Sequence, residues 1–179
     1  MFPPQICEYL PESSGRASAE PVALEPVVLD TDTLSELSRG NPIVKARAAA
    51  YLTEFGRLTI TAVTVFERLR GYRAAIRAGK PFAGQLQAFE ALVANCVVLP
   101  FDQDAAAVAS DMWAASTQRL RRQLGDILIA GVAASRQIPL ATRNRRDFQQ
   151  FAKASGVSLR LVDWTKVTPR AIRGPDDRA

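Results

Sequence analysis

The stretch GDILIAGVAASRQIPLATRNRRDF, residues 125–148, carries the clearest signal for the fold. Asp126 begins an apolar segment that predicts a helix to about residue 135. The run IPLATR at 138–143 then predicts a buried strand, and Asn144 opens a second helix that ends at about residue 154. A short apolar strand between two helices is typical of proteins in which helical crossovers join parallel strands.

The same alternation extends in both directions along the chain. Further strands are predicted at 26–30, 58–61, 97–100 and 158–164, and further helices at 31–40, 42–55, 64–78, 82–94 and 102–122. Repeated strand–helix units favour an α/β fold with a mostly parallel central sheet that helices cover on both faces. In such a sheet, functional residues gather at the carboxyl ends of the strands.

Length and composition bound the domain organisation. The chain has 179 residues, of which 47% are hydrophobic and 23% charged, as in a soluble protein with one globular domain. We expect that domain over 26–167, a flexible extension over 1–25 and a polar tail over 168–179. No apolar run approaches the roughly 18 residues needed to cross a bilayer, and the first residues lack the features of a signal peptide. We therefore expect a cytoplasmic protein without membrane contact.

Histidine is absent from the chain. Its absence excludes Ser-His-Asp and Cys-His triads, histidine-ligated zinc and a histidine general base. The two cysteines, Cys7 and Cys96, have no metal-binding spacing, so we predict two reduced thiols and no structural zinc site. A formal net charge of +5 is compatible with a polyanionic partner such as nucleic acid. An enzyme of this composition would depend on carboxylates, Lys, Arg, Ser, Thr or a hard metal ion.

Four acidic residues are predicted to meet at the carboxyl edge of the sheet. Asp30 closes the first strand, and Asp147 follows the strand at 138–143. Glu67 and Asp126 lie in the first turns of two predicted helices. Carboxylates that share a site raise one another's pKa, and a divalent ion removes this cost. Mg²⁺ or Mn²⁺ prefers oxygen ligands, and either ion can activate water near neutral pH.

Each of these acids also has a structural explanation. Glu67 and Asp147 each lie three residues after a possible helix cap, which is the spacing of a capping box. Asp126 starts a predicted helix, where the helix dipole favours a carboxylate. Asp30 is the hardest to explain structurally, because a charge that closes an apolar strand at this edge is more often functional. Two further acids are predicted as N-caps, Asp32 and Asp102.

Arginines flank the predicted acidic site in the sequence. One group precedes Asp126 and the other surrounds Asn144: Arg119, Arg121 and Arg122, and Arg143, Arg145 and Arg146. Cations that bind phosphates beside acids that hold a metal are what a nuclease needs. Alternatively, these arginines are solvated surface residues or stabilise helix C-termini.

Five segments resemble, in order, the motifs of PIN domains, and especially those of VapC-type toxins. They are VVLDTDTLSEL (27–37), LTITAVTVFERLRG (58–71), VVLPFDQDAA (97–106), the segment at 125–148 and SLRLVDW (158–164). The resemblance covers about residues 26 to 166. Two departures concern the acids. The extra acid that many members carry near Asp126 is absent, and Asn144 stands where some members have an acid.

The resemblance implies a three-layer α/β/α sandwich and an Mg²⁺-dependent endoribonuclease, with Mn²⁺ as a possible substitute. It also implies a homodimer that a small antitoxin inhibits by covering the active-site groove. Carried over to this sequence, Asp30 and Asp126 are the main metal ligands, Glu67 supports them and Asp147 takes the fourth acidic place. The implied substrate is RNA, whose phosphodiester bonds are hydrolysed.

The resulting hypothesis is an in-line attack by water, with the metal ion and arginine stabilising the negative charge that develops. Thr31 or Thr142 is predicted to hydrogen-bond the carboxylates. Two alternatives remain open. One is a non-catalytic PIN-like scaffold that binds RNA or a partner, and the other is a phosphatase of the haloacid-dehalogenase type, whose opening motif DTDT at 30–33 would also fit.

Overall fold

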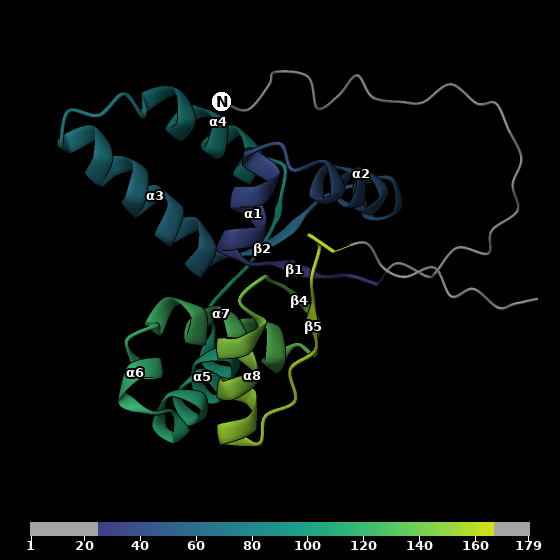
Figure 1. Ribbon diagram of the computed structural model, residues 1–179, viewed down its shortest axis with the longest axis vertical. Helices are drawn as coiled ribbons and strands as arrows, with labels where there is room; N and C mark the ends of the chain where they lie inside the picture. Colours follow the sequence, from purple (N-terminus) through teal and green to yellow (C-terminus); the bar gives the residue numbers. More distant parts are fainter. Residues whose placement is uncertain (1–24, 167–179) are drawn as a thin grey trace, which may run out of the picture.

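Five parallel strands form the centre of the computed structural model, which describes residues 25–166 (Figure 1). They are β1 (Val28–Leu29), β2 (Thr59–Thr61), β3 (Val97–Leu99), β4 (Leu140–Ala141) and β5 (Leu161–Val162). Their order in the sheet is β3-β2-β1-β4-β5, and each neighbouring pair is parallel. The extension predicted at 1–25, apart from Glu25, and the tail predicted at 168–179 lie outside the described residues, as does Cys7.

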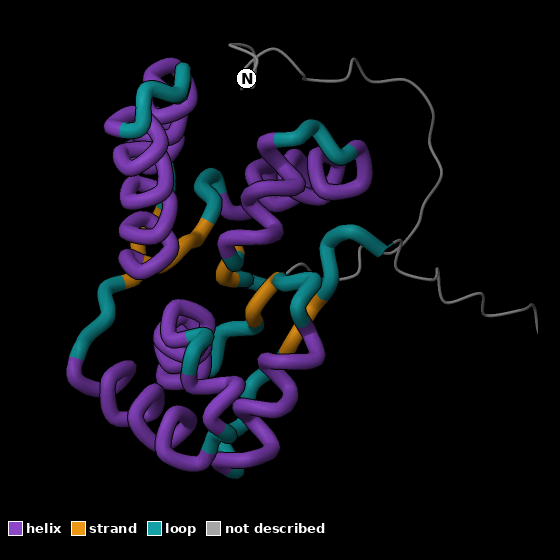
Figure 2. Tube along the Cα trace, turned by 60° about the vertical axis from the view of Figure 1, so that its left-hand side comes forward, coloured by secondary structure: helices purple, strands orange, loops and turns teal. Residues whose placement is uncertain are grey.

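Helices connect the strands throughout the described part of the chain. They are α1 (Thr31–Ser38), α2 (Pro42–Phe55), α3 (Ala62–Arg77), α4 (Ala83–Ala94), α5 (Gln103–Ala115), α6 (Gln118–Arg121), α7 (Leu124–Ser135) and α8 (Arg145–Ser155). The strands lie between α1 and α2 on one side and α5, α7 and α8 on the other, and α3 and α4 form a projecting hairpin (Figures 1 and 2). Within residues 25–166, none of the helices combines the length and apolarity of a membrane span.

The side chains of the central strands alternate between two apolar cores. Val28 and Leu140 pack with residues of α5, α7 and α8 on one face of the sheet. Their neighbours Leu29 and Ala141 pack with residues of α1 and α2 on the other face. A strand that is buried on both faces needs a continuous apolar sequence, which explains the runs VVL and IPLA. The predicted α/β/α sandwich with a parallel sheet is therefore confirmed.

The strand order reverses beside β1. The chain passes from β1 to β2 and β3 in one direction, and then returns to β4 on the other side of β1. The helices that follow β1 and β4 pack on opposite faces of the sheet, since Leu34 of α1 and Phe148 of α8 belong to different cores. Such a switch point opens a crevice at the carboxyl ends of the two strands, where α/β proteins bind ligands. Asp30 and Thr142 follow the two strands there.

Close packing fixes α7, the helix that carries Asp126. A Cβ atom at Gly131 would lie 2.7 Å from the carbonyl oxygen of Ala105 and 2.7 Å from the Cβ of Ala109 in α5. Only glycine permits this approach of the two helices. The acid in the first turn of α7 therefore belongs to a helix with little room to shift.

The helix predicted at 102–122 is broken in the structure. Helix α5 ends at Ala115, and both Ser116 and Thr117 take an extended backbone before α6 begins. The Ser116 hydroxyl donates to the carbonyl of Met112 at 2.7 Å. Serine and threonine side chains compete for backbone groups in this way and weaken a helix. The strands are also shorter than predicted, with two or three residues each.

Two smaller predictions are confirmed. Asp102 is the N-cap of α5, and its carboxylate accepts a hydrogen bond from the Ala105 N–H at 3.0 Å. Cys96 is a free and buried thiol. Neither residue takes part in the site described next.

Candidate active site

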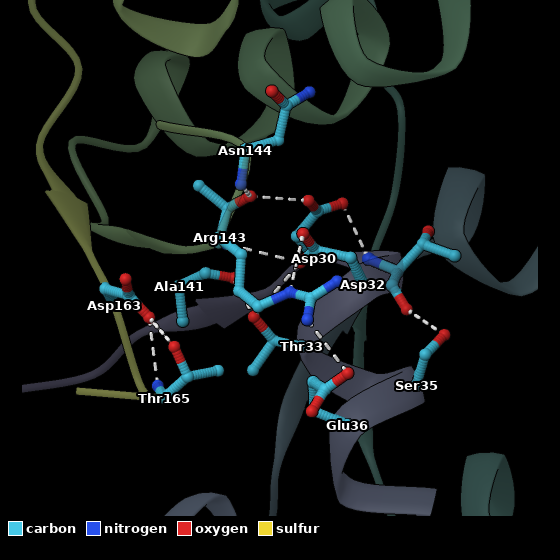
Figure 3. Close-up of polar contacts among 12 residues, drawn as sticks. Asp30, Asp32, Thr33, Ser35, Glu36, Ala141, Arg143, Asn144, Asp163 and Thr165 are labelled. Carbon is cyan, nitrogen blue, oxygen red and sulfur yellow. Dashed lines mark hydrogen bonds and ion pairs between the residues drawn. The ribbon is translucent and has the colours of Figure 1, made fainter. Parts of the chain in front are cut away.

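Asp30 lies directly after β1, where it is the N-cap of α1, and only 4% of its surface is exposed. Its carboxylate accepts hydrogen bonds from the Thr31 N–H at 2.6 Å and from the Thr142 hydroxyl at 2.8 Å. Thr142 follows β4, so the second bond joins the ends of the two central strands. Figure 3 shows Asp30 between the start of α1 and the segment after β4. The prediction that Thr142 hydrogen-bonds an acid is confirmed.

Glu67 reaches the same place from α3. Its Oε2 accepts a hydrogen bond from the Thr31 hydroxyl at 2.8 Å, which confirms the second predicted threonine contact. The capping-box explanation of Glu67 is wrong, because α3 begins at Ala62, two residues earlier than predicted. Thr61 is the N-cap, and its hydroxyl accepts the Thr64 N–H at 3.0 Å. Glu67 therefore lies beyond the first turn and bonds across to α1.

Asp126 lies in the first turn of α7 and is half-buried. Its Oδ2 accepts a hydrogen bond from Asn144 Nδ2 at 3.1 Å. The backbone N–H of Asn144 donates to the Thr142 hydroxyl at 3.0 Å, and that hydroxyl donates to Asp30. A continuous chain of hydrogen bonds therefore joins Asp126 to Asp30.

These side chains border one hollow of about 450 Å³. The residues that line it are Asp30, Thr31, Asp32, Ser35, Glu67, Arg70, Asp126 and Asn144. Three of the four predicted site acids thus come together from three separate elements. The fourth, Asp147, is not among the residues that line the hollow.

Asp147, in the first turn of α8, bonds instead to residues that precede α7. Its Oδ1 accepts from Arg119 at 3.0 Å and its Oδ2 accepts from Gln123 at 2.8 Å. Burial opposes the ionisation of Asp147, but the hydrogen bonds from Gln123 and Arg119 outweigh it and lower the pKa. Asn144 makes no side-chain cap bond to α8, so the capping-box explanation of Asp147 is wrong as well. These contacts tie the start of α7 to the start of α8.

Asp32 was predicted to cap α1, and this prediction is wrong. Asp30 has an extended backbone and accepts the Thr31 N–H, so the helix begins earlier and Asp32 falls in its first turn. There it lines the hollow, where the Arg143 N–H donates to its Oδ1 at 3.4 Å (Figure 3). The hollow therefore contains a fourth carboxylate, but not the one expected.

Half of the arginines predicted to bind phosphates are engaged with the protein itself. They are Arg119 with Asp147 and Gln150, Arg121 with the carbonyls of Trp113 and Ala114, and Arg143 with Asp32 and Glu36. The guanidinium groups of Arg122, Arg145 and Arg146 have no hydrogen-bond or ion-pair partner within residues 25–166. The expectation of an arginine rim is therefore met only in part by the predicted groups.

The cation that does line the hollow is Arg70, which is not among the six predicted arginines. Arg70 follows Glu67 by three residues, and residues at this spacing are neighbours on one side of a helix. This spacing is the feature of the sequence from which Arg70 could have been predicted. Once Glu67 is assigned to the site, it indicates a cation beside it.

Burial and like charge together disturb the acids of the hollow. The pKa of Asp30 is raised to about 8, first by burial and then by the charges of Asp32 and Asp126, although the Thr142 hydrogen bond opposes the shift. The pKa of Asp126 is raised to about 6 by burial and by the charge of Glu67. Carboxylates outnumber the single cation Arg70 in the lining, so Asp30 tends to keep its proton near neutral pH unless a further cation joins the site.

The model of the PIN domain family matches residues 27–154. The chain belongs to the PIN domain family. PIN domains are generally nucleases that use divalent metal ions. This membership gives no support to the haloacid-dehalogenase-type phosphatase that the DTDT motif left open.

The PIN domain is also similar to solved structures. FitAcB from Neisseria gonorrhoeae has a TM-score of 0.60 and 20% identity, with 79% of this chain and 99% of that chain covered. VapBC-1 from nontypeable Haemophilus influenzae has a TM-score of 0.59 and 24% identity, with 78% and 98% covered. DNA-bound VapBC from Salmonella typhimurium has a TM-score of 0.59 and 23% identity, with 79% and 99% covered. At these identities the likeness concerns the fold. A comparison with curated proteins gave no match.

The donor set of the PIN domain hollow suits a hard divalent ion, because it consists of carboxylate, hydroxyl and amide groups without sulfur. Within residues 25–166, no three acidic or cysteine side chains are arranged to hold one ion together. Mg²⁺ commonly takes only one or two carboxylates and completes its shell with water and phosphate oxygens. The pair Asp30 and Asp126, with their raised pKa values, fits an ion held in that manner.

The stability of the metal-free PIN domain should depend on pH through Asp30 and Asp126. Both have folded pKa values above the ordinary value of 3.8, at about 8 and about 6. Their stabilising contribution is complete below 3.8 and is lost as the pH rises through the two folded values, because the unfolded chain then holds fewer protons. We expect the melting temperature in EDTA to fall across this window.

Millimolar Mg²⁺ should raise the melting temperature more at about pH 8 than at about pH 5. At the lower pH the acids keep their protons, which compete with the ion. Circular dichroism melts in EDTA and in Mg²⁺ at both pH values measure this difference. The Asp30→Asn variant is the control, and its Mg²⁺ effect should be much smaller. An equal Mg²⁺ effect on wild type and variant would contradict the assignment of the ion to Asp30.

Gly125 allows the acids of two helices to approach each other. A Cβ atom at this position would lie 1.8 Å from Oε1 of Glu67. The Glu67 carboxylate therefore occupies the space that a side chain on α7 would need. Because Gly125 precedes Asp126, this contact brings the carboxylates of α3 and α7 to the same side of the hollow.

Gly125→Ala should lower nuclease activity about 10- to 100-fold, because the methyl group displaces the Glu67 carboxylate. The fold should survive, since the displaced atom is the end of a flexible side chain. Gly71→Ala is the matched control. It lies in α3, its Cβ would meet nothing within 4 Å, and alanine should stabilise the helix by up to about 1 kcal/mol. Equal activity of the two variants in a cleavage assay would show that the Glu67 position does not matter.

Proposed function

We propose that this PIN domain is a metal-dependent endoribonuclease that hydrolyses RNA phosphodiester bonds, and that it acts in the cytoplasm as the toxin of a VapC-type toxin–antitoxin pair. The observation that carries the proposal is the hollow in which buried Asp30 meets Glu67 and Asp126. Membership of a family of nucleases supports phosphodiester hydrolysis. RNA as the substrate rests on the resemblance of the sequence motifs to those of VapC-type toxins.

Asp30 and Asp126 would hold the ion, Mg²⁺ or Mn²⁺, with Glu67 as a third carboxylate beside them. When bound, such an ion lowers the pKa of a water molecule and offsets negative charge on the phosphate. The Thr142 hydroxyl orients the carboxylate of Asp30, and the Thr31 hydroxyl orients that of Glu67, each through a hydrogen bond of 2.8 Å. Such outer contacts keep acidic groups in one position.

Arg70 would bind an oxygen of the scissile phosphate from the rim of the hollow. It is the only cation among the described residues that line the hollow, and a guanidinium group matches the geometry of a phosphate. The same contact stabilises the negative charge that develops when the phosphodiester is attacked. Arg70 would thus take the role predicted for the two arginine groups before Asp126 and around Asn144.

Asp147 remains the predicted fourth acid. Its bonds to Arg119 and Gln123 support a second role, in which it keeps the starts of α7 and α8 together. That would hold Asp126 and Asn144 at the distance at which they bond. The two roles differ in the effect expected when the charge is removed.

We also propose that a small antitoxin covers the hollow and that the PIN domain forms a homodimer. The likeness in fold to the complexes VapBC and FitAcB supports a protein partner. A covered hollow would prevent RNA from reaching the acids, which is how such a partner would inhibit cleavage. Co-expression of the chain with any small protein encoded beside it, followed by co-purification of the two, would test this pairing.

The decisive experiment is cleavage of an end-labelled single-stranded RNA by the purified chain. Cleavage should occur with millimolar Mg²⁺ or Mn²⁺ and stop in EDTA. RNA binding that EDTA leaves unchanged, without cleavage, would favour the non-catalytic scaffold. Turnover of a small phosphomonoester without RNA cleavage would favour a phosphatase and overturn the proposal.

A further inference from the structure

A second groove, of about 650 Å³, runs along the exposed side of α3. The residues that line it are Phe66, Leu69, Arg70, Arg73, Ala74, Arg77 and Ala78, and we call it the α3 groove. None of these residues is acidic, and three are arginines. An apolar floor between guanidinium groups is a surface on which nucleic-acid bases and phosphates can both be accommodated.

The α3 groove and the acidic hollow share one residue. Arg70 lines both of them. The two surfaces are therefore neighbours, and a polymer whose phosphate binds Arg70 in the hollow can continue along α3. Helix α3 belongs to the hairpin that projects from the sheet, so the groove leads away from the acids (Figure 1).

The arginines of the α3 groove form a row. Arg70, Arg73 and Arg77 are three and four residues apart, which separates them by about 4.5 and about 6 Å along the helix axis. All three are exposed. Arg73 lies 3.9 Å from Glu90, but both side chains are more than half exposed, and such surface pairs are weak competitors for a phosphate. A row of cations at this spacing suits a chain of regularly repeated negative charges.

Phe66 adds an aromatic surface at the end of the row. Its side chain is 60% exposed, so it contributes little to the apolar core. The Arg70 guanidinium lies 5.4 Å from the centre of its ring. Because Arg70 also lines the hollow, the ring lies near the cation proposed to bind the scissile phosphate. Aromatic rings and arginines placed together are typical of surfaces on which unpaired bases stack.

We propose that the α3 groove binds single-stranded RNA next to the cleavage site, with phosphates on Arg73 and Arg77 and an unpaired base stacked on Phe66. This deepens the proposed function and rests on it for the identity of the polymer. Charge favours RNA over a protein partner, because the residues that line the groove offer three cations and no anion. A base-paired helix would not stack on the ring, since its bases are already stacked on each other.

The experiment measures binding rather than cleavage, so that the two proposals can fail separately. A fluorescein-labelled single-stranded RNA is titrated with the full-length Asp30→Asn chain in EDTA, and its anisotropy is followed at several salt concentrations. The test variant adds Arg73→Ala and Arg77→Ala. The matched control adds Arg57→Ala, which removes an exposed arginine from the loop between α2 and β2. This loop precedes β2 and so lies at the amino ends of the strands, away from the hollow.

The Arg73→Ala and Arg77→Ala pair should weaken binding at least about tenfold at low salt. It should also reduce the slope of log affinity against log salt by about 1.4, because two phosphate contacts are lost. The Arg57→Ala control should change neither quantity. Phe66→Ala should weaken binding about fivefold or more, and Phe66→Trp should restore it. Duplex RNA of the same sequence should be insensitive to Phe66→Ala.

Equal RNA affinity of the test and control variants would overturn the proposal, as would a chain that binds no RNA. Unchanged affinity with a change in sedimentation would assign the α3 face to a second copy of the chain, and loss of antitoxin binding alone would assign it to that protein. If wild type cuts no RNA but these variants lose binding, the α3 groove stands and the proposed function falls. If wild type cuts RNA and the variants bind RNA normally, the proposed function stands and the α3 groove proposal falls.

Discussion

Replacing Asp30 with Asn should lower RNA cleavage by more than about a hundredfold and leave the fold intact. Loss of an outer hydrogen-bond partner of a metal ligand costs about 10- to 100-fold, and Asp30→Asn removes a proposed ligand charge itself. The amide can still accept the hydrogen bond from Thr142. Because the change removes a buried acid whose pKa is raised to about 8, the melting temperature in EDTA near neutral pH should stay the same or rise.

Cleavage rates under saturating Mg²⁺ and a thermal melt of the same sample separate loss of chemistry from loss of fold. Asp111→Asn is the control, because Asp111 is an exposed acid on α5 and makes no ion pair within residues 25–166. It should cleave RNA at the wild-type rate. An Asp30→Asn variant that cuts as fast as this control would remove the basis of the nuclease assignment.

Asp126→Asn should also reduce cleavage by more than about a hundredfold, whereas Asp147→Asn should reduce it by about tenfold at most. Asp126 lines the hollow, but Asp147 does not and bonds instead to Arg119 and Gln123. The Asp147→Asn amide keeps one acceptor for these donors and so preserves part of the link between α7 and α8. The contrast distinguishes a charge that acts on the ion from one that holds two helices together.

Activity of the two variants should be measured across a series of Mg²⁺ concentrations. Asp126→Asn should need more Mg²⁺ for half-maximal activity, whereas Asp147→Asn should keep the wild-type requirement. A loss in Asp147→Asn as large as that in Asp126→Asn, together with a raised Mg²⁺ requirement, would instead show that Asp147 acts on the ion from the fourth acidic place that the sequence resemblance gives it.

The layers of the fold could be predicted because they depend on local sequence. Runs such as VVL and IPLA are apolar on both sides only because helices cover both faces of the sheet. The ends of the elements were less predictable. The break falls at Ser116, whose hydroxyl bonds back to Met112, and α3 is capped by Thr61 rather than Thr64. Several residues nearby could have served each purpose equally well.

The meeting of three of the acids could be predicted, because the carboxyl ends of parallel strands lie at the same edge of a sheet. Asp30, Glu67 and Asp126 meet because β1 ends, and α3 and α7 begin, at one edge of the sheet. It was less predictable that Asp32 would line the hollow and Asp147 would not, because both acids lie in the first turn of a helix that begins at this edge. Arg119 bonds to Asp147 and Arg143 pairs with Asp32, and these contacts form only when the helices are packed.

The Thr142 hydroxyl has consequences beyond the bond it makes. It has a single proton, which it gives to Asp30, and its oxygen receives the N–H of Asn144. Asn144 also holds Asp126 through its amide. Two neutral residues that belong to neither acid's own helix or strand therefore link the two principal acids. Because Asn144 is also the N-cap of α8, a small tilt of that helix would strain both bonds of Asn144, even though α8 contributes no acid to the hollow.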